Sequence, residues 1–227
     1  MKILITGSSR GIGAFLMKEL IKKDYDVFGT YHSSSVTEFK EKLTKVDIKD
    51  ENQVRDWINS KVTSKDNVVL INCAGSNYNS FAHKAQADEW KSVVETNLFG
   101  TFYAIQNVLP IMREKGFGRI INFASIVAQK GIPGTSAYAA SKSALWGLSK
   151  SIAVENANKG ITINNLNLGY FDIGMITDVP DPILDQIKNS IPSKSLGNPE
   201  NILRSVEYLI NNEYINGSSL DINGGLF

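Results

Sequence analysis

The feature of this sequence that most restricts its fold is a regular alternation of short apolar segments with longer amphipathic ones. The short segments are almost continuously apolar, which is typical of parallel strands that are covered by helices on both faces. The longer segments carry apolar residues at helical spacing. Strands that alternate with helices build βαβ units, so the pattern predicts an α/β fold with a parallel sheet.

We expect residues 1–227 to form one Rossmann-type domain, a doubly wound parallel sheet of about seven strands with helices on both faces. The strands are predicted at 3–6, 27–31, 44–47, 68–72, 119–124, 162–166 and 219–222. The helices are predicted at 11–23, 51–62, 88–115, 136–159 and 199–212. Asn198 is suited to cap the last helix, with Pro199 at its first position.

The least regular part of the chain is 172–196, which contains Pro180, Pro182 and Pro192. It is longer than a simple connection in a compact domain, and such segments are usually functional. We therefore predict that 172–196 is a substrate lid.

The net charge, the cysteine content and the lengths of the apolar segments argue against several classes of protein. The net charge of +1 marks neither a nucleic-acid partner nor a membrane surface. A single cysteine, Cys73, can build neither a disulfide framework nor a metal cluster, and it indicates a reducing compartment. The apolar run at 1–7 is too short for a signal peptide, and no window has the apolar length of a membrane span. We therefore expect a cytoplasmic protein that binds no metal.

A glycine-rich turn, Thr6-Gly7-Ser8-Ser9-Arg10-Gly11-Ile12-Gly13, separates the first predicted strand from the first helix. Glycines let the backbone turn sharply and approach a pyrophosphate, and the helix N-terminus offers free N–H groups to the anion. The position of the turn, between a strand and a helix, favours a dinucleotide site over a glycine turn without a ligand.

The segment after the second strand bears on which nucleotide binds. An NAD site usually has a carboxylate here for the ribose hydroxyls, and none occurs between Phe28 and Ser35. Arg10 can pair with a 2′-phosphate, and Ser9, His32 and Ser33 can add hydrogen bonds. We therefore expect NADP(H), with NAD(H) as the alternative.

Four further residues are candidates for chemistry beside the predicted dinucleotide site. Tyr138 and Lys142 have the i, i+4 spacing that places both on one helix face. Ser125 ends the preceding strand at the carboxyl edge of the sheet, where open α/β sheets bind ligands. Asn97 lies within the long helix predicted at 88–115.

Taken in this order, the glycine turn, Asn72-Cys73-Ala74-Gly75, Asn97, Ser125 and the Tyr138/Lys142 pair resemble the short-chain dehydrogenase/reductase family over essentially the whole chain. Arg119-Ile120-Ile121-Asn122 and the closing Asn223-Gly224-Gly225 look most like the bacterial 3-oxoacyl-carrier-protein reductases. The resemblance implies an oxidoreductase that transfers a hydride between nicotinamide and a ketone or secondary alcohol.

The resemblance assigns roles within this reaction. Tyr138 would be the general acid in reduction and the base in oxidation. Lys142 would lower the pKa of Tyr138 and hold the nicotinamide ribose. Ser125 would orient the substrate oxygen, and Asn97 would hold a water that links Lys142 to solvent. The expected cofactor contacts are Gly7, Ser9, Arg10, Gly11, Ile12, Gly13, Tyr31, His32, Ser33, Asp47, Ile48, Asn72, Ala74, Gly75, Tyr138, Lys142, Gly169 and Ile173.

The chain departs from the family pattern near the cofactor. Cys73 replaces a second asparagine and is expected only to pack. Leu168-Gly169 replaces Pro-Gly, and Ile173 replaces a threonine whose contact Thr177 can take over.

The two long helices, 88–115 and 136–159, carry apolar residues around more than one face, so each must be buried twice. In this family they form a dimer interface, which predicts a homodimer or homotetramer. Two alternatives to the reductase remain: an alcohol or sugar dehydrogenase that works in the oxidative direction, and a non-catalytic NADP(H)-binding regulator on the same fold.

Overall fold

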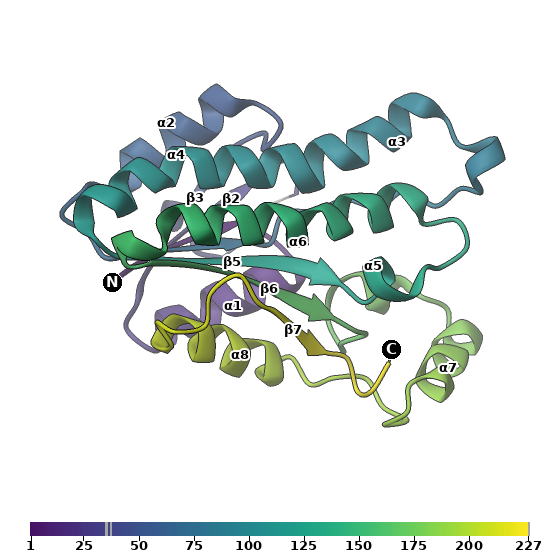
Figure 1. The fold of residues 1–227 in the computed structure, drawn as a ribbon. Helices are drawn as coiled ribbons and strands as arrows, with labels where there is room; N and C mark the ends of the chain where they lie inside the picture. Colours follow the sequence, from purple (N-terminus) through teal and green to yellow (C-terminus); the bar gives the residue numbers. More distant parts are fainter. Residues whose placement is uncertain (35, 37, 227) are drawn as a thin grey trace.

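The computed structural model describes residues 1–34, 36 and 38–226, and in this part of the chain seven parallel strands form one sheet (Figure 1). The strands are β1 (Lys2–Thr6), β2 (Asp26–Tyr31), β3 (Leu43–Lys45), β4 (Val68–Asn72), β5 (Gly118–Ser125), β6 (Ile161–Leu168) and β7 (Ser219–Ile222). Their order is β3-β2-β1-β4-β5-β6-β7. The direction of winding reverses between β1 and β4, and ligands bind at such switch points in open α/β sheets.

Helices cover both faces of this sheet (Figure 1). They are α1 (Gly11–Lys22), α2 (Glu51–Lys61), α3 (Ala87–Val94), α4 (Gly100–Lys115), α5 (Val127–Lys130), α6 (Ser136–Asn156), α7 (Asp181–Ser190) and α8 (Glu200–Asn211). Helices α1 and α8 pack on one face, and α2, α4 and α6 pack on the other. Because neighbouring strand residues point to opposite faces, Ile3 belongs to the first core and Leu4 to the second.

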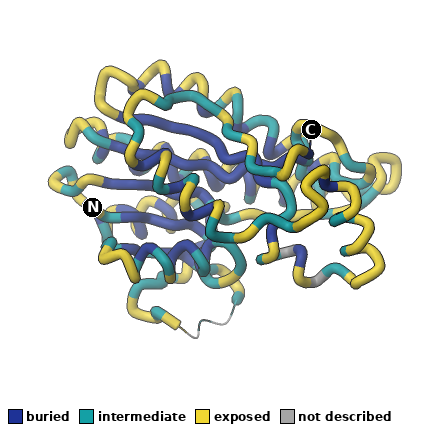
Figure 2. Tube along the Cα trace, turned by 90° about the horizontal axis from the view of Figure 1, so that it is seen from below, coloured by how far each residue is buried: buried dark blue, intermediate teal, exposed yellow. Residues whose placement is uncertain are grey.

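The central strands lie deepest in the molecule. Every residue of β4, β5 and β6 is buried, while the outer faces of the helices are exposed (Figure 2). Burial of apolar side chains on both faces of the sheet is the main favourable contribution to folding. These strands therefore hold their carboxyl ends, where the candidate site lies, in a fixed arrangement.

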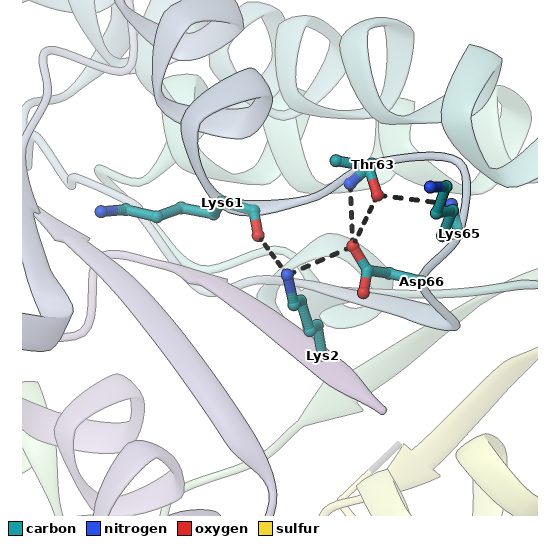
Figure 3. Close-up of polar contacts among 5 residues, drawn as sticks. All are labelled: Lys2, Lys61, Thr63, Lys65 and Asp66. Atoms are coloured by element: carbon teal, nitrogen blue, oxygen red, sulfur yellow. Dashed lines mark hydrogen bonds and ion pairs between the residues drawn. The ribbon is translucent and has the colours of Figure 1, made fainter.

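The opposite edge of the sheet is closed by a polar cluster around Lys2 and Asp66 (Figure 3). The Lys2 ammonium donates to the Lys61 carbonyl over 2.9 Å and lies 3.2 Å from the Asp66 carboxylate. The same carboxylate accepts from the main-chain N–H of Thr63 at 2.9 Å. These contacts tie the start of β1 to the loop between α2 and β4.

All seven predicted strands and the doubly wound fold are confirmed, with differences at the ends. The side chain of Asn198 accepts from the Glu200 N–H at 2.8 Å as expected of a cap, but α8 begins at Glu200, so Pro199 and not Asn198 occupies the N-cap position. Two segments that we predicted as continuous α-helices contain other helical turns. The helix predicted at 88–115 is divided by a π-helical turn, Glu95–Phe99, and the one predicted at 136–159 ends in a 3₁₀ turn, Ala157–Lys159.

The segment 172–196 is more regular than predicted. It contains a 3₁₀ turn, Gly174–Asp178, and the ten-residue helix α7. Pro180 and Pro182 suggested an irregular segment, but prolines are also favoured where a helix begins. Among the described residues, no helix has both the length and the apolar character needed to cross a bilayer.

Candidate functional site

The glycine turn between β1 and α1 can be built only with glycine at its key positions. Gly7 has a φ of 68°, and a Cβ there would lie 2.7 Å from Cα of Ala74. A Cβ on Gly13 would lie 2.3 Å from the Gly7 carbonyl oxygen. Helix α1 has no side chain capping its N-terminus. Its first N–H groups therefore remain available to an anion such as a pyrophosphate.

A second turn, after β4, lies against the first. The hydroxyl oxygen of Thr6 accepts hydrogen bonds from the N–H groups of Cys73 and Ala74, each at 3.1 Å. The two turns at the switch point of the sheet are therefore held together by one side chain. They form one wall of a cleft of about 840 Å³.

Most of the predicted cofactor contacts line this cleft. They are Gly7, Ser9, Arg10, Gly11, Ile12, Gly13, Tyr31, His32, Ser33, Asp47, Ile48, Ala74, Gly75 and Ile173. Thr177, expected to compensate for Ile173, also lines it, with its hydroxyl donating to the Gly174 carbonyl at 2.8 Å.

Four predicted cofactor contacts are not part of this lining: Tyr138 and Lys142, described below, and Asn72 and Gly169, which have other partners. The Asn72 amide is buried and donates to Asn122 over 2.8 Å, so it points into the sheet. Gly169 packs against Asn223, and its N–H donates to the carbonyl of Ile222. Both predictions were made from motif position, which does not tell whether a residue faces the cleft or the neighbouring strand.

Charged residues outside the motifs also reach the cleft. Lys18 and Glu38 line it, with 4.0 Å between their ammonium and carboxylate groups. His32 lies 3.8 Å from Asp47 in the same cleft. Lys18 follows Gly11 by two helical turns, a spacing from which its place on the cleft face of α1 was predictable. The position of Glu38 depends on how the loop after β2 folds back.

Asn97 lies in the π-helical turn between α3 and α4, a distortion that is frequent at functional sites. Its side chain accepts from the Ser76 N–H at 2.8 Å and donates to the Ser76 carbonyl at 3.0 Å. It also donates to the Ser141 hydroxyl over 3.0 Å. Asn97 therefore connects the wall of the cleft to α6.

Ser125, Tyr138 and Lys142 are brought together by β5 and α6. Ser125 ends β5 with its hydroxyl accepting from the Val127 N–H at 3.2 Å. The Lys142 ammonium lies 5.7 Å from the centre of the Tyr138 ring. It also lies next to Gly75, because a Cβ built on that glycine would be 3.7 Å away. These three side chains thus adjoin the cleft, although Tyr138 and Lys142 are not part of its lining.

Burial is the main influence on the pKa values of Tyr138 and Lys142. Burial raises the pKa of Tyr138, while the neighbouring Ser125 hydroxyl lowers it. Burial lowers the pKa of Lys142 to about 8. We expected Lys142 to depress the pKa of Tyr138, but desolvation of the phenol raises it, and the lowering contribution comes from the Ser125 hydroxyl and not from Lys142. Tyr138 is therefore protonated near neutral pH.

Cys73 lies beside these groups as a neutral thiol. It is half-buried and packs against the core, and desolvation raises the pKa of its thiol to about 12. This agrees with the expected packing role.

Gln129 and Tyr170, which follow β5 and β6, have their contacts outside this cleft. The Gln129 amide donates to Asp221 over 2.8 Å, so it is engaged with β7. Tyr170 lines a separate cavity of about 360 Å³ together with residues such as Leu196 and Asn198. The end of the predicted lid thus borders a second cavity.

Comparison with known proteins identifies a consistent set of relatives. A family model described as short chain dehydrogenase matches residues 1–183. The 3-oxoacyl-(acyl-carrier-protein) reductase FabG of Staphylococcus epidermidis is 34% identical, covering 99% of this chain and 98% of that protein. The acetoacetyl-CoA reductase of Shinella zoogloeoides is 36% identical over 99% of this chain and 97% of its own.

A solved structure has the same fold. The structure of ElxO with NADP bound superimposes with a TM-score of 0.89 and 29% sequence identity, covering 99% of this chain and 98% of that one.

Proposed function

Because this chain belongs to the short-chain dehydrogenase/reductase family and is an enzyme of that type, we propose that it reduces the ketone of a 3-oxoacyl thioester with NADPH. The observation that carries this proposal is the convergence of Ser125, Tyr138 and Lys142 beside the dinucleotide cleft. The named activities of two relatives, a 3-oxoacyl-carrier-protein reductase and an acetoacetyl-CoA reductase, support a 3-oxoacyl group as substrate.

The cleft fits a dinucleotide. Its glycine turn leaves no space for a Cβ at Gly7 or Gly13, and the uncapped N-terminus of α1 faces the place where a pyrophosphate would lie. Arg10, His32 and Ser33 would hold the 2′-phosphate of NADPH, and the related ElxO structure has NADP bound. The bound cofactor supplies the hydride. NADH remains the alternative cofactor.

The chain's own residues manage the proton and the substrate oxygen. The Ser125 hydroxyl donates a hydrogen bond to the carbonyl oxygen and orients the ketone. The Tyr138 phenol, protonated near neutral pH, transfers its proton to that oxygen as the carbonyl carbon accepts the hydride. The Lys142 ammonium favours the phenolate that results, and Asn97 holds the cleft wall against α6.

We also propose a cytoplasmic homodimer or homotetramer. The helices within 88–115 and 136–159 keep apolar side chains exposed, with Phe99 at 48%, Phe102 at 39% and Val154 at 85%. Large exposed apolar residues on the helices of a parallel-sheet protein favour association with another subunit. The single cysteine favours a reducing compartment.

The test mixes the purified protein with acetoacetyl-CoA and either NADPH or NADH. The reaction rate is measured as the decrease in absorbance of the reduced cofactor. We expect turnover with NADPH and a loss of about 10²–10⁴-fold in Tyr138→Phe, which removes the transferred proton. The rate of the reverse reaction, oxidation of 3-hydroxybutyryl-CoA by NADP⁺, should also fall in Tyr138→Phe. No turnover with any 3-oxoacyl thioester would refute the substrate assignment, and full activity in Tyr138→Phe would refute the mechanism.

A further inference from the structure

A row of polar side chains crosses the sheet beneath helix α6. Asn72 of β4, Asn122 of β5, Asn165 of β6 and Ser219 of β7 are successive register partners, so they lie side by side across four strands. Asn72 and Asn122 are joined by a hydrogen bond of 2.8 Å, and Asn165 and Ser219 by one of 3.1 Å.

Ser149 of α6 completes this row. Its hydroxyl accepts from the Asn122 amide at 3.0 Å and donates to the Asn165 carbonyl oxygen at 2.8 Å. Ser149, Asn122 and Asn165 are all fully buried, each with 0% of its surface exposed. One helix side chain therefore joins two adjacent strands in a place that water does not reach.

The Asn122–Ser149 contact lies at a defined distance from Lys142 along α6 and from Ser125 along β5. Lys142 precedes Ser149 by two helical turns, about 10 Å along the axis of α6. Ser125 follows Asn122 by three residues, also about 10 Å along β5. Because α6 runs antiparallel to β5, these two paths lead from the Asn122–Ser149 contact to the same level at the carboxyl edge of the sheet (Figure 1).

Two further hydrogen bonds join α6 to the sheet, from the Lys142 ammonium to the Phe123 carbonyl at 2.6 Å and from the Trp146 indole N–H to Asn167 at 2.9 Å. The remaining contacts are made by apolar side chains such as Leu145, Ile152 and Ala153, which have no directional preference. Hydrophobic burial is non-directional, so it tolerates a small displacement of the helix along its axis. The buried hydrogen bonds do not, because a displacement would leave Asn122 and Asn165 unpaired in a dry environment.

We propose that Ser149 is a positioning residue that sets the axial position of α6 through Asn122 and Asn165, and thereby places Tyr138 and Lys142 against Ser125. The inference rests on the proposed reductase function for its kinetic readout. Ser149 touches neither the substrate nor the cofactor cleft; it acts through the helix that carries the catalytic pair.

The test compares Ser149→Ala with Ser151→Ala, which removes an exposed hydroxyl from the same helix. We expect kcat of Ser149→Ala to fall about tenfold or more, because small misplacements of catalytic groups have large effects on rate. The dissociation constant of NADPH should change less than about twofold, since none of Ser149, Tyr138 and Lys142 is part of the cleft lining, most of which comes from α1 and the turns after β1, β2 and β4. The alkaline limb of the kcat profile should also shift, and Ser151→Ala should match the unmodified enzyme.

The rates are calculated per NADPH-binding site at a temperature where each variant is folded by circular dichroism. A purely structural role predicts normal kcat and an unchanged pH profile for the folded fraction, and that result would overturn the proposal. If Ser149→Ala does not accumulate, Asn165→Ser removes the acceptor of the same hydroxyl and undergoes the same measurements.

A crystal structure of the variant separates this inference from the proposed function. We expect the contact of 2.6 Å between the Lys142 ammonium and the Phe123 carbonyl to lengthen. If it does, while the unmodified protein reduces no 3-oxoacyl thioester, the positioning role stands and the substrate assignment fails. An unchanged contact with normal turnover would refute the positioning role alone.

Discussion

The ammonium of Lys142 donates to the main-chain carbonyl of Phe123 over 2.6 Å, so helix α6 is hydrogen-bonded to the strand that ends in Ser125. Lys142 is almost fully buried, with 5% of its surface exposed. The carbonyl is the one hydrogen-bond acceptor of this ammonium among the described residues. Desolvation by this burial lowers the pKa of Lys142 to about 8.

This burial predicts how Lys142 affects stability. The unfolded chain holds the lysine proton up to about pH 10.5, whereas the folded protein releases it above about pH 8. Between these values the unfolded state binds more protons, so the stability that Lys142 contributes rises with pH. The stability of the unmodified protein relative to Lys142→Met should therefore increase between about pH 7 and pH 10.

Urea denaturation at several pH values measures this difference. Lys150→Met, which alters an exposed lysine on the same helix, is the control and should show no such trend. A stability difference for Lys142→Met that is constant across this pH range would contradict the prediction.

A second prediction concerns cofactor choice. Arg10→Gln should weaken NADPH binding about tenfold, because it removes a charge-assisted hydrogen bond to the 2′-phosphate, and should leave NADH binding nearly unchanged. Binding is measured by the fluorescence of the reduced cofactors. Arg55→Gln, at an exposed position on α2, is the control. Equal losses for both cofactors would show that Arg10 does not recognise the 2′-phosphate.

A third prediction is that removing the charge of Glu38 strengthens NADPH binding, whereas removing the charge of Arg10 weakens it. Its carboxylate lies in the cleft and pairs with Lys18 at 4.0 Å. In Glu38→Gln, Lys18 is released and the like-charge repulsion of a phosphate is removed, so NADPH should bind about two- to fivefold more tightly, in keeping with an exposed pair. The gain should shrink at high salt. The same change at Glu41, which does not line the cleft, should alter neither cofactor; weaker NADPH binding in Glu38→Gln would contradict this assignment.

The Lys2–Asp66 cluster predicts acid sensitivity at the other edge of the sheet. Hydrogen bonding, first from the Thr63 N–H, lowers the pKa of Asp66 below its usual value. A carboxyl with a lowered folded-state pKa stabilises the protein above its unfolded pKa and loses that contribution as pH falls through the folded value. Asp66→Asn should therefore lower Tm near neutral pH, and the difference should shrink as pH falls below the ordinary pKa of an aspartate. Thermal unfolding followed by circular dichroism tests this, and a deficit that persists in acid would contradict it.

The proposed assembly predicts that Phe102→Ser shifts the protein toward monomers. Phe102 is 39% exposed on α4, and its loss from an interface would remove apolar contact area. Sedimentation velocity at several protein concentrations is the measurement. Tyr208→Ser, which changes an exposed aromatic residue on α8, tests whether the effect belongs to this face. If Phe102→Ser leaves the distribution unchanged while Tyr208→Ser alters it, the interface lies elsewhere.

Much of the fold and the site followed from local sequence. The glycine turn was recognisable because close packing at Gly7 and Gly13 excludes a side chain. The strands were recognisable because burial on both faces demands continuous apolar residues, as in β4. Tyr138 and Lys142 could be paired because helical geometry places them on one face.

Tertiary structure alone decided the contacts between segments that are distant along the chain. The Asn122–Ser149 and Lys18–Glu38 contacts depend on how a helix or loop packs, and no local pattern encodes this. Tertiary structure also directs the Asn72 side chain into the sheet. It makes burial, and not a neighbouring charge, the main influence on the pKa of Tyr138. Local sequence determines which elements form through short-range sterics and periodicity, whereas desolvation and hydrogen-bond partners depend on everything that surrounds a group once the chain has folded.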